Sequence, residues 1–185
     1  MGRWEPDAKG RMVSAALDLY SERGFDATTA SDIAERAGVT ERTFFRHFKD
    51  KREVLFDGSA TLEHAAYDAI LAAPADASPL DAALAGVVAA GGFLDGIRDH
   101  ALRRSRIVAA NPSLQERELL KLASMTESTA RALRERGVTE PHATLAAHSA
   151  VTVFHVAFSQ WIATDDTPAF ATHVSDAATA LRALS

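Results

Sequence analysis

Basic and aromatic side chains are interleaved over residues 38–52, GVTERTFFRHFKDKR. From residue 36 to residue 52 six basic residues stand against two acidic ones, a formal charge of +4, whereas the whole chain carries −5. Arginine and lysine neutralise phosphates, and arginine and threonine also reach base edges in the major groove of DNA. This segment therefore indicates a surface for nucleic acid on a protein that is otherwise acidic.

Two phenylalanines of this segment are spaced to anchor a short helix. Phe44 and Phe48 are four residues apart, so both lie on one face of a helix, and we expect that face to pack inward. Three side chains then point outward: Arg42, Thr43 and Arg46. Arginine pairs with two acceptors of guanine and the threonine methyl group suits the methyl group of thymine, so these are the predicted base readers.

Two further positions suit contacts with the DNA backbone. Thr40 precedes the short helix, where its hydroxyl group and the neighbouring backbone N–H groups can bind a phosphate. Lys51 is expected in the first turn of the next helix, where it would meet a phosphate in the same way. Each neutralised phosphate releases counterions, so we expect binding to weaken steeply with salt. The alternative is a helix pair that serves only in packing, with its basic residues solvated.

The surrounding pattern predicts an all-α protein. Alanine and leucine dominate, apolar residues recur at helical spacing, and the alternation typical of strands is almost missing. Thr29 followed by Asp32 predicts a capping box, Gly38 is suited to end the helix it opens, and prolines mark later helix starts. The expected helices span about 7–23, 29–37, 40–47, 50–72, 79–91, 112–136, 141–163 and 168–184, with a less regular stretch between 93 and 109.

Residues 24–56, GFDATTASDIAERAGVTERTFFRHFKDKREVLF, resemble the DNA-binding domain of the TetR family of bacterial transcriptional regulators. They keep the family's order: a glycine-aromatic start, Thr-x-x-Asp-Ile-Ala, Ala-Gly-Val-Thr, Thr-Phe-Phe-x-x-Phe, and a lysine that opens the fourth helix. Beyond about residue 57 only the length and the helical class agree. The resemblance implies a three-helix, helix-turn-helix DNA-binding domain, residues 1–49, followed by a helical ligand-binding and dimerisation domain, residues 50–185.

The resemblance also implies roles for individual residues. Thr29 and Thr40 would be helix caps close to phosphates, and Arg42 and Thr43 would read bases. Three more residues are implied to lie at the DNA backbone: Phe45, His47 and Lys51.

Phe45 departs from the family's pattern. A tyrosine commonly stands at this position, and its hydroxyl group binds a phosphate. Phenylalanine lacks that group, so the expected contact is apolar, on a sugar or a thymine methyl group, and Arg46 is placed to replace the lost phosphate contact.

A homodimeric regulator is the function that the resemblance implies. Most often such a protein is a repressor, released from a palindromic operator in double-stranded DNA when a small-molecule effector binds. A single helix-turn-helix reads only a few base pairs, so geometry also favours a symmetric dimer on a palindrome. No cofactor is expected, and the protein is expected to act in the cytoplasm.

The dimer surface is expected in the last two helices. Residues 142–162 are small and apolar over most of the helix circumference, and residues 168–184 have one apolar face: Phe170, Val174, Ala177, Ala178 and Leu181. Two such helices from each subunit would make a four-helix bundle. The alternative is that both helices only close the core of one subunit.

Large apolar and aromatic residues of the second domain are candidates to line the effector pocket. They are Phe93, Ile97, His100, Met125, Phe154, Phe158 and Trp161. An aromatic stripe at helical spacing is more often ordinary core, and this alternative stays open. Arg103, Arg104 and Arg106 would either bind an anionic group of the effector or pair with carboxylates on the surface.

The sequence argues against an enzyme or a metal protein. His148 and His155 are seven residues apart, too far for a helical i, i+4 metal site, and no HExxH, phosphate-loop or nucleophile-elbow motif occurs. Cysteine is absent, which excludes thiolate chemistry. No uninterrupted apolar stretch reaches the roughly 18 residues of a membrane span, so no membrane partner is expected. A helical protein-interaction module, the third class considered, would not need the local positive charge.

Overall fold

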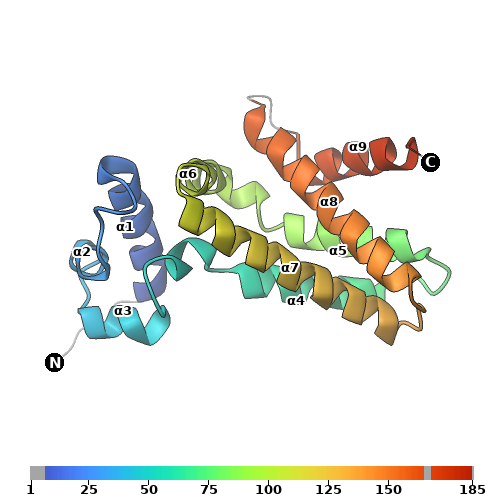
Figure 1. Ribbon diagram of the computed structural model, residues 1–185, viewed down its shortest axis with the longest axis horizontal. Coiled ribbons are helices and arrows are strands. Elements are labelled where there is room, and N and C mark those ends of the chain that lie inside the picture. Colours follow the sequence, from blue (N-terminus) through green and yellow to red (C-terminus); the bar gives the residue numbers. More distant parts are fainter. Residues whose placement is uncertain (1–6, 165–167, 185) are drawn as a thin grey trace. The chain divides into compact units, whose positions relative to one another are not determined.

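The computed structural model describes residues 7–164 and 168–184, and within these ranges the regular secondary structure is entirely helical (Figure 1). The α-helices are α1 (Ala8–Arg23), α2 (Ala30–Arg36), α3 (Glu41–His47), α4 (Ser59–Ala72), α5 (Pro79–Gly91), α6 (Arg98–Ala109), α7 (Pro112–Glu135), α8 (His142–Ala163) and α9 (Phe170–Arg182). Two short 3-10 helices are η1 (Glu53–Phe56) and η2 (Asp95–Ile97). The predicted all-α fold class is confirmed.

Two compact units divide the chain. The N-terminal unit comprises residues 7–57 together with 102–118, and the helical unit comprises the other described residues. Helices α6 and α7 each contribute residues to both units. The compact N-terminal unit continues to Asp57 and includes a second segment, residues 102–118. The domain boundary expected after residue 49 stays a prediction.

One apolar core holds the N-terminal unit together, with side chains from α1, α2, α3, η1 and the 102–118 segment. Its largest fully buried members are Met12, Leu17, Ile33, Phe44, Val54 and Leu114. Helix α1 ends at Arg23, where Gly24 adopts a φ of +89° that favours glycine, and the Gly24 N–H group donates to Tyr20 O. The core thus ties the three N-terminal helices to one another.

Two arginines fasten the 102–118 segment within this unit. Arg103 pairs with Asp18 of α1 at 2.7 Å. Arg104 donates from Nε to Leu55 O at 2.7 Å and pairs with Glu118 at 2.8 Å. Both guanidinium groups therefore have partners inside the fold, which favours the surface-pairing alternative over an anion site.

The predicted helix over 50–72 is wrong in one respect, because the structure breaks it in two. Asp50 does cap its start, accepting hydrogen bonds at 2.8 and 3.2 Å from two backbone N–H groups that follow. Only η1 follows, and its apolar side chains are buried in the N-terminal core. Gly58 then adopts a φ of +83°, which an α-helix cannot accommodate, and α4 begins afresh at Ser59.

In the helical unit, α4, α5, α8 and α9 surround a second core. Phe170 is fully buried there, with its ring centroid 5.8 Å from that of Phe154 and 5.7 Å from that of Trp161. A Cβ atom added to Gly91 of α5 would lie only 2.1 Å from the Phe170 ring, so glycine permits this close packing. Four residues of the α9 face expected at the dimer surface are buried in this way: Phe170, Val174, Ala177 and Ala178. This face therefore closes the core of one chain.

One apolar stretch, residues 79–109, is long and apolar enough by composition to cross a membrane, with a mean hydropathy of 1.5 over its best window. It is divided among α5, η2 and α6, and 44% of that window is buried within the protein. A core helix passes the same test of composition, and the buried share fits that role.

Candidate nucleic-acid interface

Helices α2 and α3 form the predicted helix-turn-helix. Gly38 adopts a φ of +68° in the turn, and the Val39 N–H group donates back to Ala34 O at 2.9 Å, which reverses the chain tightly. Ile33 of α2 and Phe44 of α3 are both fully buried in the core of the N-terminal unit, so the two helices pack on the same core. The turn and the packing together set the direction of α3.

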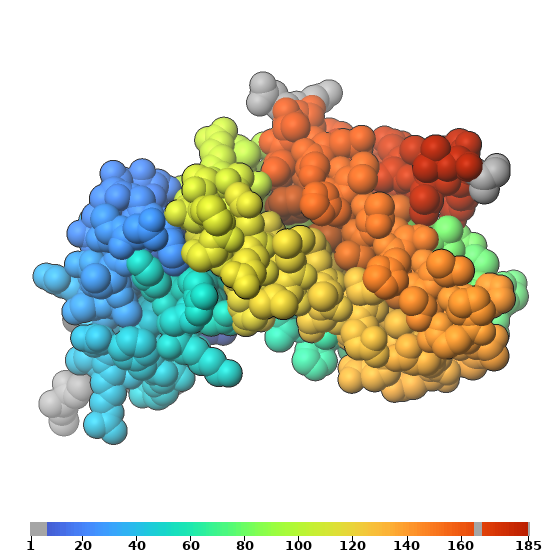
Figure 2. Space-filling model, viewed as in Figure 1, coloured from blue at the N-terminus to red at the C-terminus, as the bar shows by residue number. Residues whose placement is uncertain are grey.

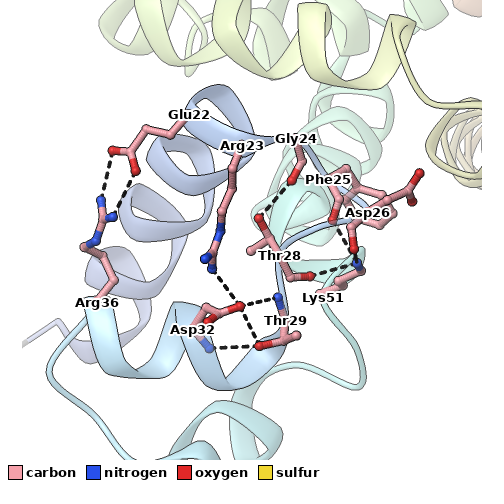
Figure 3. A network of polar contacts seen from close by, with 10 residues as sticks. All are labelled: Glu22, Arg23, Gly24, Phe25, Asp26, Thr28, Thr29, Asp32, Arg36 and Lys51. Atoms are coloured by element: carbon pink, nitrogen blue, oxygen red, sulfur yellow. Dashed lines mark hydrogen bonds and ion pairs between the residues drawn. The ribbon is translucent and has the colours of Figure 1, made fainter.

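A capping box fixes the start of α2 at Thr29 (Figure 3). Thr29 Oγ1 accepts from Asp32 N at 3.1 Å, and Asp32 Oδ2 accepts from Thr29 N and from the Thr29 hydroxyl, each at 2.7 Å. Arg23 pairs with the same carboxylate at 2.6 Å. The hydrogen bonds from Thr29, aided by Arg23, lower the pKa of Asp32 from 3.8 to about 2. The predicted cap is confirmed, while a phosphate near Thr29 stays a prediction.

We expect the contribution of Asp32 to the stability of the N-terminal unit to depend on pH. Because its pKa is lower in the folded than in the unfolded chain, the contribution is complete above about pH 4 and is lost as the pH falls through about 2. Urea unfolding of the wild type and of Asp32→Asn is followed through amide NMR signals of α2 at a series of pH values. The difference in the free energy of unfolding between the two proteins should shrink as the pH falls toward 2. A difference independent of pH would contradict this expectation.

Helix α3 turns one face to the core. Phe44 is 0% exposed and Phe48 is 4% exposed, with their ring centroids 5.5 Å apart, which confirms the predicted inward face. Thr40 caps the helix by accepting from Thr43 N at 3.2 Å, and the two threonine hydroxyl groups lie 3.0 Å apart. The Thr43 side chain is half-buried, and its hydroxyl group already has a partner within the helix.

Five side chains of α3 are exposed: Glu41 in the first turn, and then Arg42, Phe45, Arg46 and His47. Within residues 7–164 and 168–184, Arg42 forms no hydrogen bond or ion pair, and Arg46 only approaches the His47 ring at 3.5 Å. Lys49, just beyond α3, is exposed and has no partner in the same ranges. No described carboxylate neutralises these three cations, so they stay available to an anionic partner.

The other three basic residues between 36 and 52 are engaged inside the N-terminal unit. Arg36 makes two hydrogen bonds to Glu22, at 3.0 and 2.9 Å, and Arg52 pairs with Asp50 at 2.8 Å. Lys51 binds backbone carbonyl groups. Of the six basic residues, Arg42, Arg46 and Lys49 are therefore the ones whose cationic groups no described carboxylate or carbonyl group engages.

Lys51 holds the loop before α2 in place (Figure 3). Its Nζ atom donates to Phe25 O and Thr28 O at 2.8 Å each and to Asp26 O at 3.3 Å, and it lies 4.3 Å from the centroid of the Phe25 ring. An ammonium group has three N–H donors, so all of them are used. The Lys51 carbonyl also accepts from the Tyr20 hydroxyl at 2.6 Å, and burial, with a nearby carboxylate, raises the pKa of Tyr20. The predicted phosphate contact stays a prediction and would replace one of these bonds.

Replacing Lys51 with methionine should destabilise the N-terminal unit by roughly 1–3 kcal/mol, because carbonyl groups lose charged hydrogen-bond donors while the apolar stem is kept. Lys49→Met is the matched control, since Lys49 is exposed and unpaired among the described residues, and it should change stability by less than about 0.5 kcal/mol. Chemical denaturation of both variants makes the comparison. Equal effects would argue against a structural role of Lys51.

Three of the predicted pocket residues are brought together in the helical unit. The ring centroids of Phe154 and Phe158 are 6.0 Å apart, as are those of Phe158 and Trp161. Trp161 is buried and the two phenylalanines are half-buried, packed against the core of the unit. This cluster fits ordinary core as well as the wall of a cavity.

The other predicted pocket residues lie elsewhere. Ile97 and His100 line a hollow formed by residues 95–100. Phe93 is exposed and Met125 of α7 is half-buried. The membership of all seven in one pocket stays a prediction.

Arg98, in the same hollow, is a residue that the sequence did not single out. It donates to Trp161 O at 3.1 Å and to Thr164 O, and its guanidinium carbon lies 5.7 Å from the centroid of the Trp161 ring. These contacts satisfy carbonyl groups at the C-terminal end of α8. Their partners are more than sixty residues away in sequence, so no local spacing could have indicated them.

Comparison with known proteins gives the same family at the level of sequence. Residues 12–57 match the family model described as bacterial regulatory proteins, tetR family. The chain is 32% identical over 136 residues to the HTH-type transcriptional regulator TcmR of Streptomyces glaucescens, covering 69% of this chain and 59% of that protein. It is 29% identical over 125 residues to the uncharacterized HTH-type transcriptional regulator YdeS of Bacillus subtilis, covering 68% and 54%. The match thus spans less than two thirds of each relative.

Solved structures share the fold. The Thermus thermophilus FadR, a TetR-family transcriptional repressor in complex with lauroyl-CoA, has a TM-score of 0.57 and 21% identity, covering 94% of this chain and 93% of that one. The fatty acid degradation regulator FadR of Bacillus halodurans has a TM-score of 0.58 and 19% identity, covering 95% and 94%. At these identities the likeness establishes the arrangement of helices, with an N-terminal helix-turn-helix followed by a helical domain.

Proposed function

We propose that this chain, whose residues 12–57 belong to the tetR family of bacterial regulatory proteins, is a sequence-specific DNA-binding transcriptional regulator. One observation supports this most: α3, anchored by Phe44, carries Arg42 and Arg46 on its solvent side without a carboxylate partner among the described residues. They are one helical turn apart and share one face of the helix. The second helix of a helix-turn-helix enters the major groove, where arginine pairs with guanine.

Selection of bound duplexes from a random pool tests this proposal. The wild-type protein should enrich one sequence motif, and its affinity for the enriched duplex should exceed that for a scrambled duplex by roughly a thousandfold or more. Affinity for both duplexes should fall with salt, since phosphate contacts release counterions. Failure to enrich any motif would contradict the proposal.

A homodimer on a palindromic operator is the proposed assembly. Helix α8 contains no Asp, Glu, Lys or Arg along its 22 residues, yet one of its sides is exposed, with Leu145 61% and Val156 40% exposed (Figure 2, orange). The outer side of α9 carries mainly small residues, among them Ala171, Ser175 and Thr179. Small side chains, and on α8 the lack of charged residues, allow close packing against a second copy. These exposed sides, and not the buried Phe170 face, support the dimer.

Val156→Arg should convert the dimer to a monomer, because an unpaired guanidinium group would be buried at the centre of the proposed surface. Sedimentation velocity measures the mass, and circular dichroism should show an unchanged helix content, since Val156 is exposed in one chain. Phe170→Glu is the contrasting variant and should unfold the helical unit. A dimer that persists in Val156→Arg would place the interface on another surface.

We propose that the protein is a repressor that acts in the cytoplasm. Binding of a small molecule would release it from the operator. Phe154, Phe158 and Trp161 provide the apolar wall proposed for the effector site. To move the protein from mostly bound to mostly free, an effector must favour the non-binding conformation by about 10⁴-fold. Displacement of a labelled, selected duplex by metabolites, measured through fluorescence anisotropy, tests this. If no metabolite in the library displaces the duplex, the result would favour regulation through the cellular amount of this protein alone.

A further inference from the structure

Phe45 is the large apolar side chain on the solvent side of α3, where it is 52% exposed. It lies three residues after Arg42 and directly before Arg46, the two arginines without carboxylate partners among the described residues. Its ring makes an edge-to-face contact with the buried Phe44 ring, at 5.3 Å and 87°. An exposed aromatic ring that rests on a buried one is thus part of the surface that carries the unpaired cations.

The chemistry of this ring restricts what it can recognise. A phenylalanine side chain has no hydrogen-bond donor or acceptor for a phosphate or a base edge. Among the groups that base pairs present in the major groove, the 5-methyl group of thymine is the apolar one. The unpaired Arg42, Arg46 and Lys49 around the ring make a polyanion the electrostatically complementary partner of this surface.

The helical register brings the ring to the proposed base-reading surface. Successive residues of an α-helix are turned by about 100°, with 3.6 residues per turn. Arg42 and Arg46 therefore lie nearly opposite the buried Phe44, and Phe45 lies to one side of them. A helix that directs Arg42 toward the base edges would bring Phe45 beside a neighbouring base pair.

We propose that Phe45 determines sequence specificity by packing its ring on the 5-methyl group of a thymine in each half-site. This inference rests on the proposed function, since it requires α3 in the major groove. It gives Phe45 a role in choosing the operator sequence, whereas a backbone contact would affect all sequences alike.

Deoxyuridine tests the proposal, because it differs from thymidine only in lacking the 5-methyl group. Each thymine of the selected duplex is replaced singly by deoxyuridine, and wild-type affinity is measured by fluorescence anisotropy. Burying one methyl group is worth about a fourfold change in affinity, so one position in each half-site should show a loss of about that size. The remaining positions should show little change.

Two variants assign the effect to the ring. In Phe45→Ala the methyl effect at that position should disappear, and in Phe45→Leu, which keeps an apolar side chain, it should persist. Arg42→Ala is the control on the same surface and should keep the methyl effect while losing affinity elsewhere in the site. Near-ultraviolet circular dichroism of Phe45→Ala verifies that the N-terminal unit keeps its packing.

The outcomes separate this inference from the proposed function. A methyl effect that persists in Phe45→Ala, or the lack of any methyl effect in a wild-type protein with clear sequence preference, would overturn the role of Phe45. A wild-type protein that prefers no sequence at all would overturn the proposed function instead.

Discussion

Replacing Phe44 with alanine is expected to lower the free energy of unfolding of the N-terminal unit by about 3–5 kcal/mol. The side chain is fully buried at the centre of the core that joins α1, α2 and α3, so its removal leaves a cavity as well as lost apolar contacts. Domains are stable by only about 5–15 kcal/mol, so this variant should be close to unfolded at moderate temperature.

Phe45→Ala provides the matched control, one residue further along the same helix. Phe45 is 52% exposed and loses mainly its edge contact with Phe44, so we expect a change of about 1 kcal/mol or less. Chemical denaturation followed by amide NMR signals of α2 and α3 measures both variants. Similar destabilisation by the two substitutions would mean that α3 does not face the core as described.

Arg42→Ala is expected to lose about 1–3 kcal/mol of affinity for the selected operator and little for a scrambled duplex. The reason is that Arg42 carries an exposed guanidinium group without a partner among the described residues, on the side of α3 opposite its anchor. Losing a base contact removes discrimination, whereas losing a phosphate contact weakens binding to all sequences.

Arg52 and Lys49 are the matched controls for this substitution. Arg52 is also an exposed arginine, but it pairs with Asp50, so Arg52→Ala should change operator affinity little. Lys49→Ala should weaken binding to both duplexes equally and reduce the slope of log affinity against log salt by about one. An equal loss of specificity in all three variants would contradict the assignment of Arg42 as a base reader.

The local part of the site could be predicted from the sequence. The spacing of Phe44 and Phe48 gave the inward face of α3 because helical periodicity depends only on neighbours along the chain. The Thr29 and Thr40 caps followed for the same reason, since a cap bonds to an N–H group three residues away.

Features that depend on distant partners could not be predicted. From the sequence alone, Lys51 is predicted to bind a phosphate. In the structure its ammonium group donates to three carbonyl groups that lie more than twenty residues earlier in the chain. The 102–118 segment joins the N-terminal unit through Arg103 and Arg104, which have partners far away in sequence. The apolar face of α9 looks the same in sequence whether it packs within one chain or between two.

The most direct test of whether α3 reads the major groove through Arg42 is to replace single guanines of the operator with 7-deazaguanine and measure the affinity. This base lacks only the N7 acceptor, which lies in the major groove and is one of the two atoms that arginine binds on guanine. At one guanine in each half-site the substitution should weaken wild-type binding at least severalfold, and it should have no effect on Arg42→Ala. Equal losses in the two proteins, or no loss at any guanine, would contradict the account.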